Sequence, residues 1–249
     1  AELAEVAGVD LLAAVERGDA VSARAIAAEA EGAFADLVDR MNTRTGGRAL
    51  FAGAAVDGDA LAPAEDMLAD LRAAAAGAVD GSDLAARIDA WFDDPAGGFA
   101  TTGWLGEDEA ARARLGDDVE TAISVRADAP EIREALKALA LAAVAAEPIA
   151  GVSQRTAMQG FALAAERSTV AVDGLIRVRA DLGLSEARIE EADTSARARR
   201  TALEIAWNDQ VNRDPFDAAS EFQALETQLQ TAYTVAARLS RLTFADFLR

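Results

Sequence analysis

The sequence predicts a mainly α-helical protein, with an elongated stem of antiparallel helices and a small inserted α+β domain. Hydrophobic residues make up 51% of the chain, but half of them are alanine and aromatic residues reach only 5%. Alanine has the highest helix propensity and buries little surface, so this composition favours long helices packed side by side. Apolar residues recur at helical spacing toward both ends, whereas turn-rich and strand-like patterns are confined to the middle.

The N-terminal part of the stem is predicted to contain two helices. The apolar spacing between Glu2 and Glu16 indicates the first, which Gly18 ends. Asp19 or Ser22 can cap the second. One face of that second helix has the spacing of a helix-pair seam: Ile26, Ala30, Ala33, Leu37 and Met41. The helix is expected to stop before Gly46 and Gly47, the next helix-breaking residues.

The middle of the chain has shorter predicted elements. The Asp57-Gly58 turn signal in residues 48–63 predicts a small hairpin or an extended loop. Helices are expected near 64–76 and 82–93. Alternating residues in 119–127 then indicate a strand, and Pro130 is expected to open another helix.

The chain returns to long helices from Ser153. The first is predicted to end near Leu182, with a break at Gly183, and the second to start at Ser185. Asp214-Pro215 marks the next break. The last segment has the most regular heptad pattern in the chain: Phe222, Leu225, Leu229, Ala232, Ala236 and Leu239. Such a stripe needs a partner helix, either in the same chain or in another copy.

This order of elements predicts four segments. Residues 1–56 form the N-terminal part of the stem and end in a hairpin, and residues 57–147 form the inserted outer α+β subdomain. Residues 148–213 supply the C-terminal stem helices, and residues 214–249 form a terminal helix. In this arrangement the chain leaves on the stem, builds an outward domain and returns to the same stem.

The composition argues against chemistry and against several partners. The chain has no histidine and no cysteine, which removes the commonest general base and the commonest soft metal ligands. We therefore expect no catalytic residues, no metal and no cofactor. A net charge of -19 disfavours nucleic acid and anionic membranes as partners. The longest apolar run, residues 138–146, is too short to span a bilayer.

Other chemical readings of the sequence are weaker. Adjacent acidic pairs such as Asp93-Asp94, Asp117-Asp118 and Glu190-Glu191 lack the spacing of a calcium loop, so they are interpreted as solvated surface. The glycine-rich stretch 95–106 lacks the Gly-Lys-Ser/Thr ending of a phosphate-binding loop. An enzyme that uses carboxylates alone, and an adaptor or lectin-like role for the insert, are the alternatives.

Two stretches resemble the bacterial flagellin family. Residues 33–63 resemble its conserved turn after an N-terminal stem helix, and the residues at the matching positions are Asn42, Thr43, Gly46, Gly47, Arg48, Phe51 and Gly53. Residues 214–249 look like the C-terminal stem and terminal helix of the family's hook-associated members, and residues 168–213 resemble its stem helix.

The resemblance implies a structural protein that joins hook to filament by helical self-assembly, with filament flagellin or a flagellin-like surface binding protein as the alternative. It also implies export through the flagellar type III pathway to the cell exterior. The implied partners are hook-associated protein 1, flagellin, further copies of the chain and an export chaperone. The family's N-terminal helix has no counterpart in these residues, so we expect the polymer-forming end to be incomplete here.

Overall fold

A computed structural model describes residues 2–109, 112–114, 120–122, 125–211 and 214–246. Among these residues the protein is mainly helical, and its β-structure consists of two antiparallel two-stranded sheets and an isolated bridge between Leu61 and Trp104. This confirms the predicted mainly α fold class. The chain divides into two compact units, Ala1–Glu190 and Glu191–Arg249, and each is described by itself.

The first unit begins with two helices, α1 (Glu2–Glu16) and α2 (Ala20–Met41). Gly18 ends α1 with a φ of 68°, in the left-handed region that favours glycine. Asp19 caps α2 because its carboxylate accepts a hydrogen bond from the Ser22 N–H at 3.1 Å. The hydrogen bonds from Ser22 hold the pKa of Asp19 below its ordinary value. Both predicted helix boundaries are confirmed.

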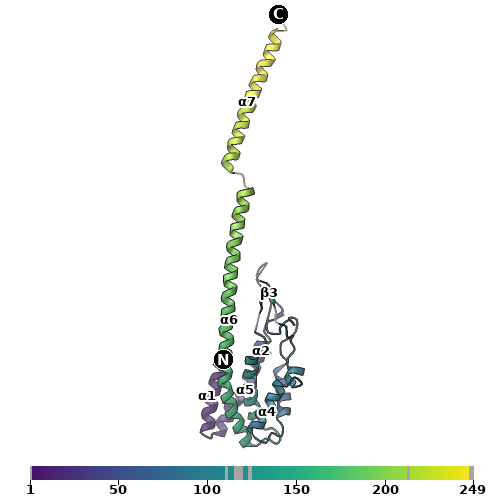
Figure 1. Cartoon of the computed structure of the whole chain (residues 1–249), viewed down its shortest axis with the longest axis vertical. Helices are drawn as coiled ribbons and strands as arrows, with labels where there is room; N and C mark the ends of the chain where they lie inside the picture. The colour runs from purple at the N-terminus through teal and green to yellow at the C-terminus, as the bar shows by residue number, and fades with distance from the viewer. Residues whose placement is uncertain (1, 110–111, 115–119, 123–124, 212–213, 247–249) are drawn as a thin grey trace. The chain divides into compact units, whose positions relative to one another are not determined.

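The buried stripe of α2 differs from the predicted seam. It consists of residues spaced four and three apart: Ala23, Ala27, Ala30, Phe34, Val38 and Met41. Ile26, Ala33 and Leu37 are only partly buried beside it. Helix α2 packs along both α1 and α5 (Pro130–Ala146) (Figure 1). The first half of the stripe is alanine, which lets neighbouring helix backbones approach closely, and its second half consists of the larger Phe34, Val38 and Met41.

A β-hairpin follows α2, earlier than residues 48–63 predicted. Strand β1 (Arg44–Thr45) pairs with β2 (Arg48–Ala49), and Gly46 and Gly47 form the turn with φ values of 60° and 82°. Two successive residues with positive φ are what a tight hairpin turn of this kind requires, and glycine supplies them at low cost. The Asp57-Gly58 pair therefore does not make a hairpin, and residues 50–63 form the loop that was predicted as the alternative.

The middle region contains the predicted helices α3 (Ala64–Ala75) and α4 (Gly81–Asp93), followed by a π-helical turn, η1 (Phe99–Gly103). Strand β3 (Arg112–Arg114) pairs with β4 (Glu120–Ala122). The strand expected at 119–127 is thus shorter, because residues 125–127 are not extended into the sheet, while 119, 123 and 124 lie outside the described residues.

Helix α5 is the centre of the first unit. Pro130 stands in its first turn, as predicted, and almost every residue from Ile132 to Ala146 is buried. It packs against α2, α3 and α4. The first turns of α6 (Gln154–Val211) complete this core, since Gly160 lies against Leu84 of α4 and Ala145 of α5.

Helix α6 is continuous, so the predicted break at Gly183 and the predicted helix start at Ser185 are wrong. Gly183 does not have a positive φ, and the Ser185 hydroxyl donates to the Asp181 carbonyl one turn earlier instead of capping a new helix. A single glycine costs a helix about 1 kcal/mol, which a helix of 58 residues tolerates.

The predicted break at Asp214-Pro215 is confirmed, with α7 (Pro215–Asp246) starting there. The Asp214 carboxylate accepts a hydrogen bond from the Phe216 N–H at 2.8 Å.

Candidate assembly surfaces

The turn that follows α2 is organised by Asn42. Its side-chain oxygen accepts hydrogen bonds from the N–H groups of Ala60 and Leu61, at 2.9 and 2.8 Å, and its amide donates to the Leu61 carbonyl at 2.9 Å. Ala60 and Leu61 are fully buried. Asn42 therefore fastens the chain entering the middle region to the end of α2.

The other predicted turn residues lie around the same point. Gly53 is buried with a φ of 64°, and a Cβ there would overlap the backbone carbonyl of Glu107. Phe51 is partly buried, and its carbonyl accepts a hydrogen bond from the Ala127 N–H at 3.0 Å. With Gly46 and Gly47 in the hairpin turn, the five residues bring the end of α2 together with segments from the middle region.

The predicted packing seam lies on α7 and faces solvent. Phe222, Leu225 and Leu229 are 69%, 54% and 56% exposed, and Leu239 is 57% exposed. Ala232 and Ala236, which continue the stripe, are exposed as well. Fully buried leucines such as Leu68 and Leu141 of the first unit show the burial that a packed seam would reach.

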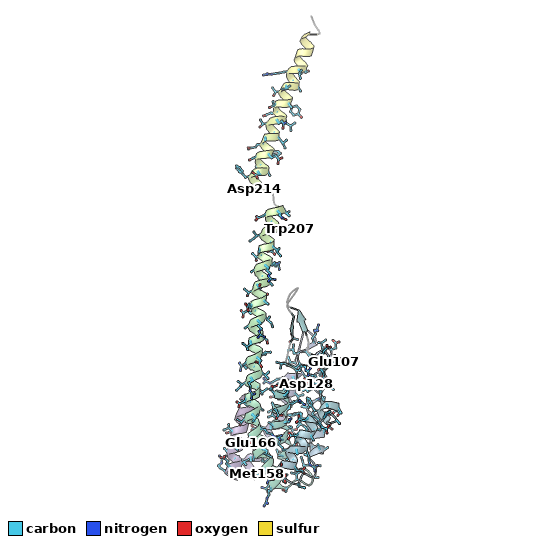
Figure 2. All side chains as sticks on the ribbon, viewed as in Figure 1. Glu107, Asp128, Met158, Glu166, Trp207 and Asp214 are labelled. Carbon is cyan, nitrogen blue, oxygen red and sulfur yellow. The ribbon has the colours of Figure 1, made fainter. Side chains whose placement is uncertain are left out.

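A second apolar stripe, on α6, was missed at the level of sequence. Leu182, Ile189 and Leu203 are spaced by multiples of seven, so they share one face of the continuous helix, and they are 41%, 37% and 70% exposed. Trp207, one turn further, is 66% exposed (Figure 2). The seven-residue spacing was the available signal, but the assumed break at Gly183 divided it.

Charged residues link α4, α5 and α6 in the first unit. Lys137 is buried, and its ammonium contacts Asp93 and Glu134, each at 2.6 Å. Burial lowers the pKa of Lys137, but the hydrogen bonds to the two carboxylates outweigh it and the pKa is raised. Arg167 of α6 makes a bidentate pair with Asp89 of α4 at 2.7 Å.

The remaining charged candidates are ordinary surface features. On α6, Arg197 pairs with Asp193 and Arg200 pairs with Glu204, each one turn apart along the helix. Such exposed pairs contribute little to stability. The acidic pair Asp117-Asp118 lies outside the described residues.

Within the described ranges, no group of acidic residues has the arrangement of a metal site, and no helix has the length and hydrophobicity to cross a bilayer. The glycine-rich stretch 95–106 closes on an aromatic cluster, in which the rings of Trp91 and Phe92 meet edge to face at 4.8 Å and Phe99 lies beside both. Gly98 is close enough to Trp91 that a Cβ would overlap the indole. These glycines serve packing.

The C-terminal helices match a family model. Residues 167–248 match the family model for the bacterial flagellin C-terminal helical region, which covers most of α6 and all of α7. Comparisons of the chain with curated proteins and with solved structures found no match. The match over residues 167–248 supports the flagellin family and suggests a flagellar structural protein.

Proposed function

We propose that this protein is a structural component of the bacterial flagellum that joins hook to filament by helical self-assembly. The observation that carries the proposal is the exposed apolar stripe on α7, within the region that matches the flagellin C-terminal helices. The C-terminal sequence features that resemble hook-associated members favour the junction over the filament. Filament flagellin, or a flagellin-like surface binding protein, is the alternative.

The stripe has the properties of an assembly surface. Its residues follow steps of three and four, which keeps them on one side of α7, whereas Gln223 and Gln230 lie on the opposite side. About half of each leucine is still exposed. Covering that half contributes about 0.8 to 1.5 kcal/mol per leucine, because full burial of a leucine is worth about 1.5 to 3 kcal/mol. A partner helix packed along the stripe would gain this free energy at each leucine that it covers.

The proposed partners are hook-associated protein 1, flagellin and further copies of the chain, with an export chaperone before assembly. The proposed location is the extracellular flagellum, reached through the flagellar type III pathway. The division into residues 1–56, 57–147, 148–213 and 214–249 remains a prediction, and so does the assembly role of the seam and turn residues. The proposal involves no catalysis and no cofactor.

The test replaces seam leucines in cells whose own copy of the gene is deleted. We expect Leu225→Glu with Leu229→Glu to abolish filament attachment and swimming, because assembly would have to bury two carboxylates. Gln223→Glu with Gln230→Glu adds the same charge on the opposite side of α7 and should leave filament attachment and swimming unchanged. Equal behaviour of the two double variants would contradict the assembly role of the seam.

A second readout separates the junction from the filament. Immunogold labelling of the wild-type protein should mark the point where hook and filament meet. Label along the whole filament would establish the flagellin alternative instead. A deletion strain that still attaches filaments and swims would refute the junction role.

A further inference from the structure

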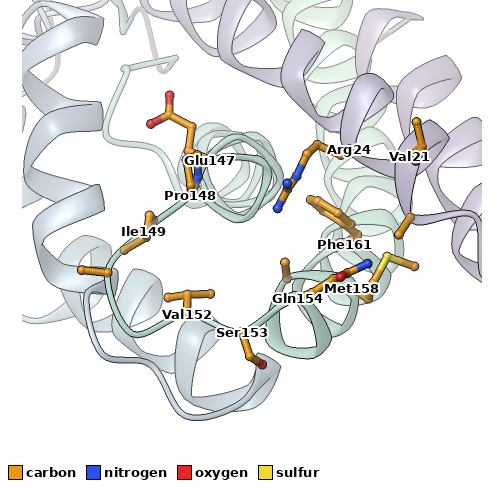
Figure 3. Close-up of a pocket in the computed structure, with 13 residues that line it drawn as sticks. Val21, Arg24, Glu147, Pro148, Ile149, Val152, Ser153, Gln154, Met158 and Phe161 are labelled. Atoms are coloured by element: carbon orange, nitrogen blue, oxygen red, sulfur yellow. The ribbon is translucent and has the colours of Figure 1, made fainter.

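One end of the first unit carries a cleft of about 580 Å³ with apolar and polar walls, where the chain turns from α1 into α2 and from α5 into α6 (Figure 3). Its walls include Val21 of α2, Ile149 and Val152 of the α5–α6 connection, and Met158 and Phe161 of α6. Phe161 forms the buried floor, while Val21 stands on the rim and is 82% exposed. Its volume is typical of sites that take a partner group.

Arginine gives this cleft a positive rim. Figure 3 shows Arg24 reaching toward the opening, and its guanidinium makes no hydrogen bond or ion pair with any described residue. Glu147, the one carboxylate in the wall, is bound by Arg72 of α3 at 2.7 Å. Asp19 is turned inward as the cap of α2. In a chain with a net charge of -19, an unpaired arginine beside exposed apolar side chains favours an acidic, apolar occupant.

Another part of the same unit offers such a group. Leu105 is 52% exposed and is followed by Glu107, Asp108 and Glu109, all exposed. The loop is held in place because the N–H groups of Leu105 and Glu107 donate to carbonyls of residues 60 and 52, each at 3.0 Å. Figure 2 shows Glu107 well separated along the unit from the cleft residue Met158. We call residues 105–109 the acidic loop.

We propose that the Arg24 cleft of one copy binds the acidic loop of a second copy. Leu105 enters the cleft, and the carboxylate of Glu107 or Glu109 pairs with Arg24. The contact joins two different surfaces of identical units, so it is heterologous and repeats from copy to copy. This inference rests on the proposed function, because it specifies one surface through which a self-assembling protein meets its own copies.

The natural absence of cysteine permits a direct test. A full chain carrying Val21→Cys is mixed with a full chain carrying Asp108→Cys, and a short bismaleimide cross-links copies whose thiols come close. We expect a crossed dimer at least about tenfold above that formed when Val170→Cys replaces the rim cysteine, since Val170 is exposed on α6 away from the cleft. Equal yields with the two cysteine positions would overturn the proposal.

Charge reversal tests the ion pair in the same assay. Arg24→Glu should lower the crossed dimer about tenfold, the change expected for one close charge pair. Glu107→Arg in the partner should restore it, and because both residues are exposed, circular dichroism should show unchanged folding. A yield that Arg24→Glu leaves unchanged would refute binding of the acidic loop. A free peptide of residues 103–109 should also compete and lower the yield. Failure of this peptide, where some other acidic peptide does lower the yield, would refute it as well.

The assay is repeated with Leu225→Glu and Leu229→Glu in both chains, so that α7 cannot contribute. Cross-linking that persists supports a separate contact at the cleft, and cross-linking that disappears shows that the seam produced it. Failure of the flagellar function would appear in the labelling and swimming experiments, whereas failure of this inference appears in the purified protein.

Discussion

Replacing Asn42 tests the turn after α2 most directly. Asn42→Ala removes three hydrogen bonds, of 2.8 to 2.9 Å, that join α2 to residues 60 and 61. Two of them satisfy backbone N–H groups of fully buried residues, which water cannot easily reach. An intramolecular hydrogen bond contributes about 1 kcal/mol net, and a buried donor left without a partner costs about 1 to 3 kcal/mol. We expect the free energy of unfolding to fall by about 2 to 4 kcal/mol.

The assay is thermal and urea unfolding followed by circular dichroism. In a unit of this size, the expected loss corresponds to a fall in Tm of about 5 to 15 °C. Asn42→Asp keeps the acceptor for both N–H groups but sets a carboxylate oxygen against the Leu61 carbonyl, so its loss should be intermediate. Thr43→Ala, at the exposed neighbouring position, is the control and should change stability by less than about 0.5 kcal/mol. An Asn42→Ala protein as stable as this control would refute the reasoning.

Three further predictions concern packing, charge and helix continuity. Lys137→Met should cost about 1 to 2 kcal/mol at pH 7, because its two carboxylate partners are about half exposed and regain water. Since the pKa of Lys137 is raised on folding, its contribution to stability is complete below about pH 10.4 and is lost as pH rises through the folded pKa. Urea unfolding at pH 7 and 11 should therefore show that the difference in unfolding free energy between wild type and Lys137→Met shrinks at the higher pH. Gly98→Ala should destabilise the first unit by about 1 to 3 kcal/mol and shift the fluorescence of Trp91, whose indole the new methyl group would overlap; an unchanged spectrum and Tm would argue against the tight contact. Gly183→Ala should raise helicity and stabilise α6 by about 0.5 to 1 kcal/mol, whereas a loss of stability would indicate a real break there.

The most accurate sequence predictions were those set by local chemistry. Gly18 and Asp19 marked the boundary between α1 and α2, Pro130 marked the start of α5, and Asp214-Pro215 marked the start of α7. In each case a backbone restriction or a capping side chain acts within one turn of the residue itself. Such signals need no knowledge of the surrounding fold.

The predictions that were wrong or displaced are those in which a local break or turn signal competed with the structure around it. Gly183 and Ser185 had the composition of a helix break, but the cost of one glycine is small beside the continuous hydrogen bonding of α6. The hairpin formed at Gly46-Gly47 and not at Asp57-Gly58, because the two glycines directly follow α2 and both adopt positive φ. In both cases a local turn or break signal was present, and the neighbouring structure decided whether the chain used it.

The candidate surfaces show the same division. The heptad stripe on α7 could be predicted as a helix face, yet only the structure shows that Phe222 and Leu225 are exposed in a single chain. The cleft beside Arg24 could not be predicted, since it is formed by segments more than a hundred residues apart. The assembly role of these surfaces stays a prediction.

The amino-acid sequence alone determined the mainly helical fold, the lack of histidine and cysteine chemistry, and the positions of the strongest helix boundaries, because composition, spacing and capping act locally. The tertiary structure decided which face of α2 is buried, how Asn42 joins α2 to residues 60 and 61, and where Lys137 and Arg24 find or lack partners. Those outcomes depend on contacts between segments that are distant in the sequence, and such a contact can be known only when the positions of both segments in the fold are known.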